Sequence, residues 1–155
     1  MLDDQRTSLD LHEQPGHLTR RLQQAHKLLW AELVGDDLTS PQFAVLNLLE
    51  QHPNIDQRRL SELVGMDRST TAEIVQRLLA RRLLTRMKDV RDGRRNVLQL
   101  DPRGAELLRR TLPAAAEVSR ELVAVLSDGD RREFLRILNL LVEAHSERLS
   151  DISAS

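Results

Sequence analysis

Apolar residues recur every three or four positions over most of the chain, the spacing that places them on one face of an α-helix. This pattern predicts six helices, over residues 17–34, 39–52, 56–65, 67–82, 101–126 and from 127 onward. Two shorter runs, residues 84–88 and 96–100, flank an Asp-Gly pair and predict a β-hairpin. Pro113 lies inside the fifth predicted helix, which we expect it to kink or break.

The residues at the helix ends support these boundaries. Asp56 is a good N-cap, because its short side chain can accept a hydrogen bond from an otherwise unpaired backbone N–H. Gly65 suits the left-handed position that ends a helix. The second helix opens with Thr39 and Ser40, and either residue qualifies as its cap.

The composition is typical of a mainly helical domain. The 155 residues include 40% hydrophobic and 30% charged residues but only 2% aromatic ones, which strands favour. A chain of this length buries a sufficient core, and the absence of cysteine excludes disulfides, thiol catalysis and thiol-based redox sensing. No apolar run is long enough to span a membrane and the acidic N-terminus does not look like a signal peptide, so we expect a cytoplasmic protein.

Charge is distributed unevenly, although the formal net charge is only −1. Residues 54–104 hold twelve basic and seven acidic residues, against eleven and seventeen in the rest of the chain. All but two of the basic residues are arginines, whose planar guanidinium groups pair well with phosphates and carboxylates. The asymmetry indicates one basic functional face.

Within this basic stretch the third helix, a tight turn at residues 65–67 and the fourth helix follow the helix-turn-helix plan. The chain resembles the MarR family of winged helix-turn-helix regulators over roughly residues 17–150. The resemblance is carried by residues 38–46, 69–78 and 82–86 and by Asp89, Asp92, Arg94, Arg95 and Leu98. It implies a mainly α fold with a two-stranded β-wing between N- and C-terminal dimerisation helices. It also implies a sequence-specific transcriptional regulator that binds double-stranded DNA, with repression as the commoner mode.

The fourth helix is the expected recognition helix. If its apolar residues pack inward, a polar face of moderate bulk remains outside and fits a DNA major groove. Gln76 can pair with an adenine edge, and Glu73 can accept from a cytosine amine. The alternative is an ordinary solvated face. The candidate DNA contacts on this helix are Arg68, Ser69, Thr70, Thr71, Glu73, Gln76 and Arg77.

Arginines gather at the tip of the predicted hairpin. We expect Arg91, Arg94 and Arg95 to enter the minor groove or to contact phosphates. The resemblance implies that Arg94 or Arg95 reaches the minor groove and that Asp89 or Asp92 supports it. The alternative is a loop whose charges neutralise one another. Because the acids limit attraction to DNA, we expect two subunits to read two half-sites of a pseudo-palindromic operator.

The two ends of the chain are expected to form a homodimer. Residues 17–37 and 102–150 carry more apolar surface than the DNA-binding region, residues 38–101, needs to cover. Residues 1–16 are expected to form a flexible acidic arm. The sixth helix carries the clearest apolar stripe: Phe134, Ile137, Leu138, Leu141, Val142, His145 and Leu149.

A small aromatic carboxylate is the expected effector. Arg21 shares a face with apolar residues, so we expect it to be partly buried or paired, and such a guanidinium is a natural carboxylate receptor. Residues 15–24 also resemble the MarR subgroup tied to aromatic-acid catabolism, whose effectors are aromatic acids or their coenzyme A thioesters. The expected pocket is lined by His17, Arg20 or Arg21, Trp30 and Phe43.

Several alternatives stay open at this point. Arg21 could instead form an interface salt bridge with Glu143 or Glu147. A metal-responsive regulator needs clustered ligands, and the five histidines form no close helical pair, so we expect no metal and no cofactor. No catalytic motif is present, so we do not expect an enzyme. A winged-helix module that binds proteins without DNA is distinguished by the salt dependence of DNA affinity.

Overall fold

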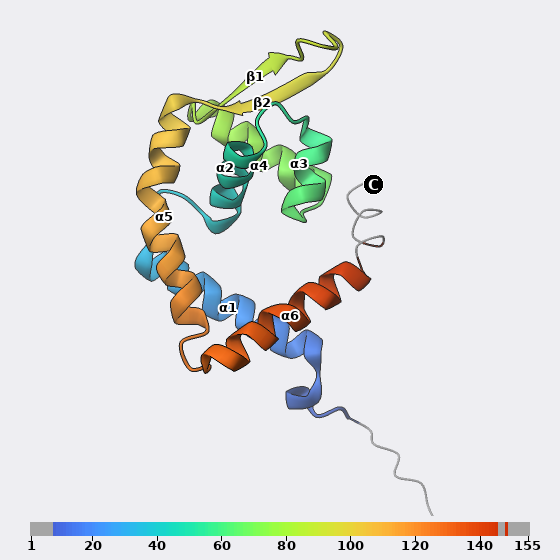
Figure 1. The fold of residues 1–155 in the computed structure, drawn as a ribbon, viewed down its shortest axis with the longest axis vertical. Helices are drawn as coiled ribbons and strands as arrows, with labels where there is room; N and C mark the ends of the chain where they lie inside the picture. Colours follow the sequence, from blue (N-terminus) through green and yellow to red (C-terminus); the bar gives the residue numbers. More distant parts are fainter. Residues whose placement is uncertain (1–7, 146–147, 149–155) are drawn as a thin grey trace, which may run out of the picture.

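The structure, a computed structural model, describes residues 8–145 and residue 148. A 3₁₀ turn, six α-helices and two strands follow one another in these residues (Figure 1). Their bounds are η1 Leu11–Glu13, α1 Pro15–Leu33, α2 Ser40–Gln51, α3 Gln57–Val64, α4 Arg68–Ala80, β1 Leu84–Lys88, β2 Asn96–Leu100, α5 Pro102–Leu122 and α6 Asp128–Ala144.

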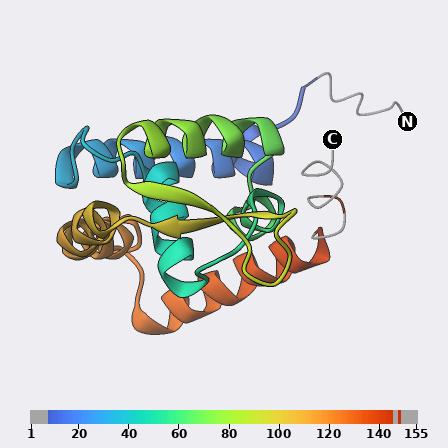
Figure 2. The same cartoon turned by 90° about the horizontal axis from the view of Figure 1, so that it is seen from above.

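The elements separate into two ends of the molecule. α2, α3, α4 and the β1–β2 hairpin form one end, α1 and α6 lie at the other, and α5 runs between them and packs along α1 (Figure 1). Seen from above, α1 and α4 lie on one side of the hairpin and α6 on the other (Figure 2). This is the mainly helical, winged helix-turn-helix arrangement that the sequence predicts.

Local capping explains where the helices of the DNA-binding region begin and end. Thr39 is the cap of α2, because its hydroxyl accepts from the Gln42 backbone N–H while the Gln42 side chain accepts from the Thr39 N–H. Asp56 caps α3, and Gly65 ends it in the left-handed conformation with φ of 69°. These two predictions are confirmed, and the choice between Thr39 and Ser40 is settled.

The hairpin is antiparallel, with Leu84 opposite Leu100 and Lys88 opposite Asn96. The predicted turn forms at the Asp-Gly pair, because the Arg95 N–H donates to the Asp92 carbonyl at 2.9 Å and closes a β-turn over residues 92–95. This turn lies within a longer loop, residues 89–95, which is closed by a hydrogen bond from the Asp89 N–H to the Arg95 carbonyl. The arginines therefore sit on an extended tip.

Two predicted boundaries are wrong, and the fifth helix is not broken at Pro113. α1 begins at Pro15, because proline has no N–H to satisfy and suits the first position of a helix. η1 precedes α1, so regular structure starts inside the arm of residues 1–16 that was predicted to be flexible. α5 continues through Pro113, which is exposed, so water can satisfy the carbonyl that it leaves unpaired. α5 then ends at Leu122 rather than near residue 126.

One apolar core holds the DNA-binding region together. It includes Leu46 of α2, Leu60 of α3, Leu78 of α4 and Leu98 of β2, all almost fully buried. α5 docks on this core through Gly104, where a Cβ atom would overlap the Leu83 carbonyl oxygen. The close approach fixes α5 against the start of the hairpin.

α6 contrasts with this core, because none of its residues is buried within the single chain. Of the predicted stripe, Phe134 is half-buried, Leu149 lies outside the described residues, and the rest are exposed. Within the described ranges, no helix is long and apolar enough to cross a membrane.

Candidate nucleic-acid interface and effector groove

The outer face of α4 presents most of the predicted DNA contacts. Val75 and Leu78 point into the core, which leaves the opposite side of the helix exposed. Glu73 and Arg77 form a long ion pair of 3.9 Å across one turn, and Gln76 lies between them in the sequence. The exposed candidates on this helix are Arg68, Ser69, Thr70, Glu73, Gln76 and Arg77.

Thr71 departs from the prediction, because it is fully buried and its hydroxyl donates to the Asp67 carbonyl. It therefore stabilises the start of α4 and does not face DNA. Ser69 and Thr70 remain exposed, but both hydroxyls donate to the Asp67 carboxylate, at 2.6 and 2.7 Å. The hydrogen bond from Ser69, together with those from Thr70, holds the pKa of the Asp67 carboxyl well below its usual range.

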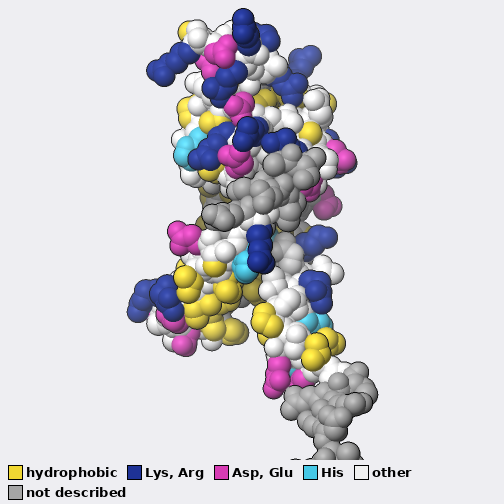
Figure 3. All heavy atoms as spheres, turned by 90° about the vertical axis from the view of Figure 1, so that its right-hand side faces the viewer, with side chains coloured by type: hydrophobic (Ala, Val, Ile, Leu, Met, Phe, Trp, Pro, Cys, Tyr) yellow, Lys and Arg dark blue, Asp and Glu magenta, His cyan; other side chains and the backbone are white. Residues whose placement is uncertain are grey.

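In the wing, the two acids hold the loop backbone. Asp89 accepts from the Arg91 N–H at 2.8 Å, and Asp92 accepts from the Arg94 N–H at 3.0 Å. The side chains of Arg91, Arg94 and Arg95 are exposed at the tip. On the face shown in Figure 3, basic side chains gather at this end of the molecule, interspersed with acids.

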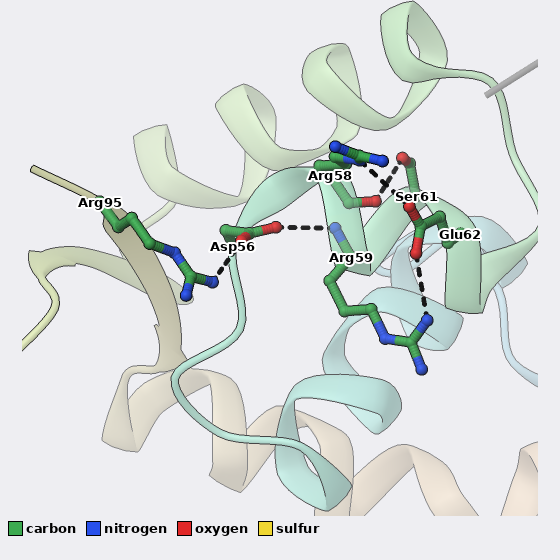
Figure 4. Close-up of polar contacts among 6 residues, drawn as sticks. All are labelled: Asp56, Arg58, Arg59, Ser61, Glu62 and Arg95. Carbon is green, nitrogen blue, oxygen red and sulfur yellow. Dashed lines mark hydrogen bonds and ion pairs between the residues drawn. The ribbon is translucent and has the colours of Figure 1, made fainter. Parts of the chain in front are cut away.

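Asp56 supplies the main side-chain contact of a wing arginine. Its Oδ2 accepts from the Arg95 guanidinium at 2.5 Å, whereas Asp89 lies 4.0 Å from Arg95 (Figure 4). The hydrogen bond from the Arg59 backbone N–H, with a smaller contribution from Arg95, lowers the pKa of the Asp56 carboxyl. The support that the resemblance assigned to Asp89 or Asp92 thus comes chiefly from the cap of α3.

The predicted effector residues do not come together in one subunit. His17 is half-buried near the start of α1 and Trp30 is buried near its end, so about 20 Å of helix separates them. Arg20 and Arg21 are both exposed. Arg21 is therefore not partly buried within one chain. The alternative interface salt bridge with Glu143 or Glu147 would join two subunits and is not tested by a single chain, and Glu147 lies outside the described residues.

Trp30 and Phe43 do meet, with ring centroids 5.3 Å apart, and His26 lies 6.0 Å from Trp30 on the same helix. The Trp30 Nε1–H donates to the Leu38 carbonyl at 2.7 Å. Trp30 therefore joins α1 to the segment that leads into α2, at the boundary between the two ends of the molecule.

A groove of about 580 Å³ lies next to this aromatic cluster. Helices α1, α5 and α6 form its mostly apolar walls, and Ser40, the first residue of α2, closes one side. Its ionisable groups are His26 and Arg131, which comes from α6. A smaller cavity of about 250 Å³ is lined by Trp30, Lys27 and Ser40, and Ser40 also lines the groove.

A metal site needs clustered ligand side chains. No group of three histidine, aspartate or glutamate side chains in residues 8–145 is arranged to hold a metal ion. The functional features of this part of the chain are thus a polar helix face, an arginine-tipped wing and a largely apolar groove.

Comparison with known proteins agrees with these features. The model of the MarR family matches residues 38–95, the second helix through the wing. The HTH-type transcriptional repressor NicR of Pseudomonas putida is 33% identical over 139 residues, which cover 89% of this chain and 88% of NicR. The chain belongs to the MarR family.

Two solved structures extend the similarity of this MarR-family chain. PcaV of Streptomyces coelicolor, in complex with its natural ligand, is 43% identical with a TM-score of 0.83, over 89% of this chain and 98% of PcaV. BpsR of Bordetella bronchiseptica, whose DNA binding is regulated by 6-hydroxynicotinic acid, is 27% identical with a TM-score of 0.82, over 86% of this chain and 96% of BpsR.

The predicted family and fold are therefore confirmed, and the chain is a DNA-binding transcriptional regulator of the MarR family. Homodimers are typical of this family. Its relatives are transcriptional regulators, a class of protein that is typically not enzymatic.

Sequence reasoning missed three residues that the structure brings to these sites: Asp56, His26 and Arg131. Asp56 was recognised only as a helix cap, because its wing contact spans residues far apart in the sequence. His26 lies one turn before Trp30, a signal that was available in the α1 sequence. Arg131 lies on α6, and nothing in the sequence indicated that α6 faces α1 across a groove.

Proposed function

We propose that this MarR-family regulator is a repressor that binds a pseudo-palindromic operator as a homodimer and leaves it when a small aromatic acid binds. Residues 17–37 and 102–150 form the dimerisation region in this proposal, and residues 38–101 form the DNA-binding region. The observation that carries it is the groove that touches both regions, through α1, α5 and α6 on one side and Ser40 on the other.

The DNA contacts divide into two kinds. Gln76 and Arg68 on the exposed face of α4 read base edges in the major groove, because both side chains can make paired hydrogen bonds to one base. Arg91, Arg94 and Arg95 on the wing reach the minor groove and the phosphates. The two half-sites lie about one helical turn apart, since both recognition helices must enter the major groove on the same side of the duplex.

The two kinds of contact respond differently to substitution. Gln76→Ala should lower sequence preference, at about 1–3 kcal/mol for a lost paired base contact. Arg94→Ala should weaken binding to all sequences and reduce the slope of log affinity against log salt by about one. Fluorescence anisotropy with selected and scrambled duplexes, at several salt concentrations, measures both. If Arg94→Ala changes neither affinity nor slope, the wing does not contact DNA.

The effector is an aromatic carboxylate, free or as its coenzyme A thioester. Arg131 offers a guanidinium for the carboxylate of the free acid or for the thioester carbonyl oxygen, and the apolar walls accept an aromatic ring beside His26. BpsR, which is regulated by 6-hydroxynicotinic acid, supports this class of ligand. A ligand in the groove touches Ser40 as well as the dimerisation helices, so it can favour a spacing of the recognition helices that mismatches the operator.

Arg20, Arg21 and His17 do not line the groove, but they remain candidates for the same ligand because Thr19, Leu22 and Gln23 of the same helix do line it. Arg131→Gln should abolish the ligand response while operator affinity stays within a few-fold of the parent. If Arg21→Ala abolishes the response instead, the carboxylate is bound by Arg21 and not by Arg131.

The ligand test uses a panel of hydroxylated benzoates and nicotinates, each also as a coenzyme A thioester, with release of operator DNA as the readout. Trp30 is the only tryptophan, and its ring lies 6.0 Å from that of His26, which lines the groove, so its fluorescence should change on binding. The proposal of an aromatic-acid effector fails if no compound changes either signal while the protein still binds its operator.

A further inference from the structure

The segment before α3 is tied directly to the wing. Ile55 pairs with Leu98 of β2 as an isolated antiparallel bridge, in which the Leu98 N–H donates to the Ile55 carbonyl at 2.8 Å. The Asn54 N–H donates back to the Leu98 carbonyl at 3.2 Å, and the Gln99 side chain donates to the Asn54 side chain. Residues 54 and 55 thus act as a short third strand along the hairpin.

Asp56 follows this strand and uses its two carboxylate oxygens differently. Oδ1 accepts from the Arg59 backbone N–H at 2.8 Å, one of the N–H groups that has no partner inside α3. Oδ2 accepts from the Arg95 guanidinium at 2.5 Å, 39 residues further along the chain (Figure 4). A serine or asparagine would cap the helix equally well, so the cap alone does not require a carboxylate.

The other arginines of the wing tip have no such anchor among the described residues. The acids of the loop, Asp89 and Asp92, accept from the backbone N–H groups of Arg91 and Arg94 and not from their guanidinium groups. Of the three tip arginines, Arg95 is the one whose side chain is held by the segment that begins α3; further down the wing, Arg86 of β1 donates to the Gln57 side chain of α3 at 3.3 Å. The position of Arg95 therefore follows the position of α3.

We propose that Asp56 is a positioning residue for DNA binding, which holds Arg95 and the wing in the orientation that meets the minor groove. The inference rests on the proposed DNA contact of the wing. An exposed arginine samples many rotamers, and fixing one of them before binding lowers the entropy lost in the complex. A guanidinium has five N–H donors, so the contacts with Asp56 and Asp89 leave donors free for DNA.

The test is a double-mutant cycle on operator affinity, with a duplex that the parent protein selects from random-sequence DNA. Asp56→Ser keeps the cap of α3 but is too short to reach Arg95. Arg95→Ala removes the group that is held, and the double variant completes the cycle. Asp101→Ser, which replaces the aspartate cap of α5 at the end of β2 opposite the wing tip, is the matched control. Asp56→Asn keeps the shape of the side chain without its charge, should the serine variant not fold.

Arg95→Ala should weaken operator binding about tenfold. Asp56→Ser should weaken it about fivefold when Arg95 is present, but change it less than about twofold when it is combined with Arg95→Ala, because Asp56 acts through Arg95. Asp101→Ser should leave operator affinity unchanged. Asp56→Asn should fall between the parent and the serine variant.

Two results overturn the proposal while leaving the wing's role intact. An equal loss from Asp56→Ser in both backgrounds shows that Asp56 acts independently of Arg95. Tighter binding by Asp56→Ser shows that the carboxylate competes with DNA for Arg95. If Arg95→Ala itself has no effect, the proposed DNA contact of this arginine fails, and the positioning role fails with it.

Discussion

The DNA-binding region and helix α6 use their apolar residues in opposite ways. In the former, residues such as Leu46, Leu60 and Leu78 are completely buried within one chain. In α6, Leu138 is 38% exposed, and Leu140, Leu141 and Val142 are each at least half exposed. Figure 3 shows apolar side chains gathered at this end of the molecule, far from the basic wing.

The DNA-binding region therefore buries its apolar residues within one chain, whereas α6 does not. A helix-turn-helix needs its core to hold the recognition helix, and one chain supplies that core completely. α6 leaves several large apolar side chains exposed in the single chain, and in the proposed dimer a second copy covers them. Substitutions in each region distinguish the DNA-binding region, whose core is complete in one chain, from α6, which is proposed to need a partner.

The largest effect is expected from Leu138→Asp in α6. The substitution places a charge in the proposed seam between subunits, at a cost of about 3–5 kcal/mol of dimer stability. The mass measured by light scattering should fall from twice 17.7 kDa to 17.7 kDa, and operator binding should weaken strongly. Asn139→Asp on the polar side of α6 adds the same charge as a control and should remain dimeric. A variant at residue 138 that stays dimeric contradicts the proposed seam.

Gly104→Ala should instead lower the unfolding stability of the DNA-binding region. The added methyl group overlaps the Leu83 carbonyl oxygen, which is backbone and cannot rotate away, so unfolding should become easier by about 1–3 kcal/mol. Urea denaturation measures the change. Gly129→Ala in α6 meets no atom closely and is the matched control, with a change near zero. An unchanged stability for Gly104→Ala would mean that α5 does not dock on the hairpin as described.

Most of the DNA-binding region could be predicted from its sequence. The helix caps at Asp56 and Gly65, the strands around residues 84–100 and the polar face of α4 all depend on local residue patterns. The errors were also local. Thr71 was interpreted as a groove contact because hydroxyl side chains suit both caps and DNA, and only the packed helix shows that it is buried.

Trp30→Phe tests the hydrogen bond that joins α1 to the segment leading into α2. The phenylalanine ring still packs on Phe43 but cannot donate to the Leu38 carbonyl, which is left buried without its partner. The expected loss is about 1–2 kcal/mol of unfolding free energy. His26→Gln, which removes the neighbouring ring but not this hydrogen bond, should cost less. Equal losses in the two variants would argue against a structural role for the indole N–H.

The smallest effect concerns the acidic cap of the recognition helix. The pKa of Asp67 is lowered in the folded state, so its contribution to stability is present above the ordinary carboxyl pKa and is lost as the pH falls below it. Asp67→Asn keeps the cap without the charge. The melting temperature of the parent should exceed that of the variant at about pH 6, and the gap should shrink below about pH 4. A gap that is the same at both pH values contradicts the account.

The residues that line the effector groove could not be predicted from the sequence. His17 and Trp30 lie on one helix and were assigned to one pocket, but helix length keeps them about 20 Å apart. The groove is instead made where α1, α5 and α6 converge, and Arg131 enters it from a helix at the opposite end of the sequence from His26. Such convergence depends on tertiary packing, which local periodicity does not encode.

The central claim, that two copies of this chain read DNA together, is tested most directly by selection of bound duplexes from random-sequence DNA. The account predicts enrichment of a pseudo-palindromic site whose half-sites lie about one helical turn apart, bound by two chains per duplex. It also predicts that the selected affinity falls steeply with salt. No enrichment, or an asymmetric site bound by a single chain, would contradict it.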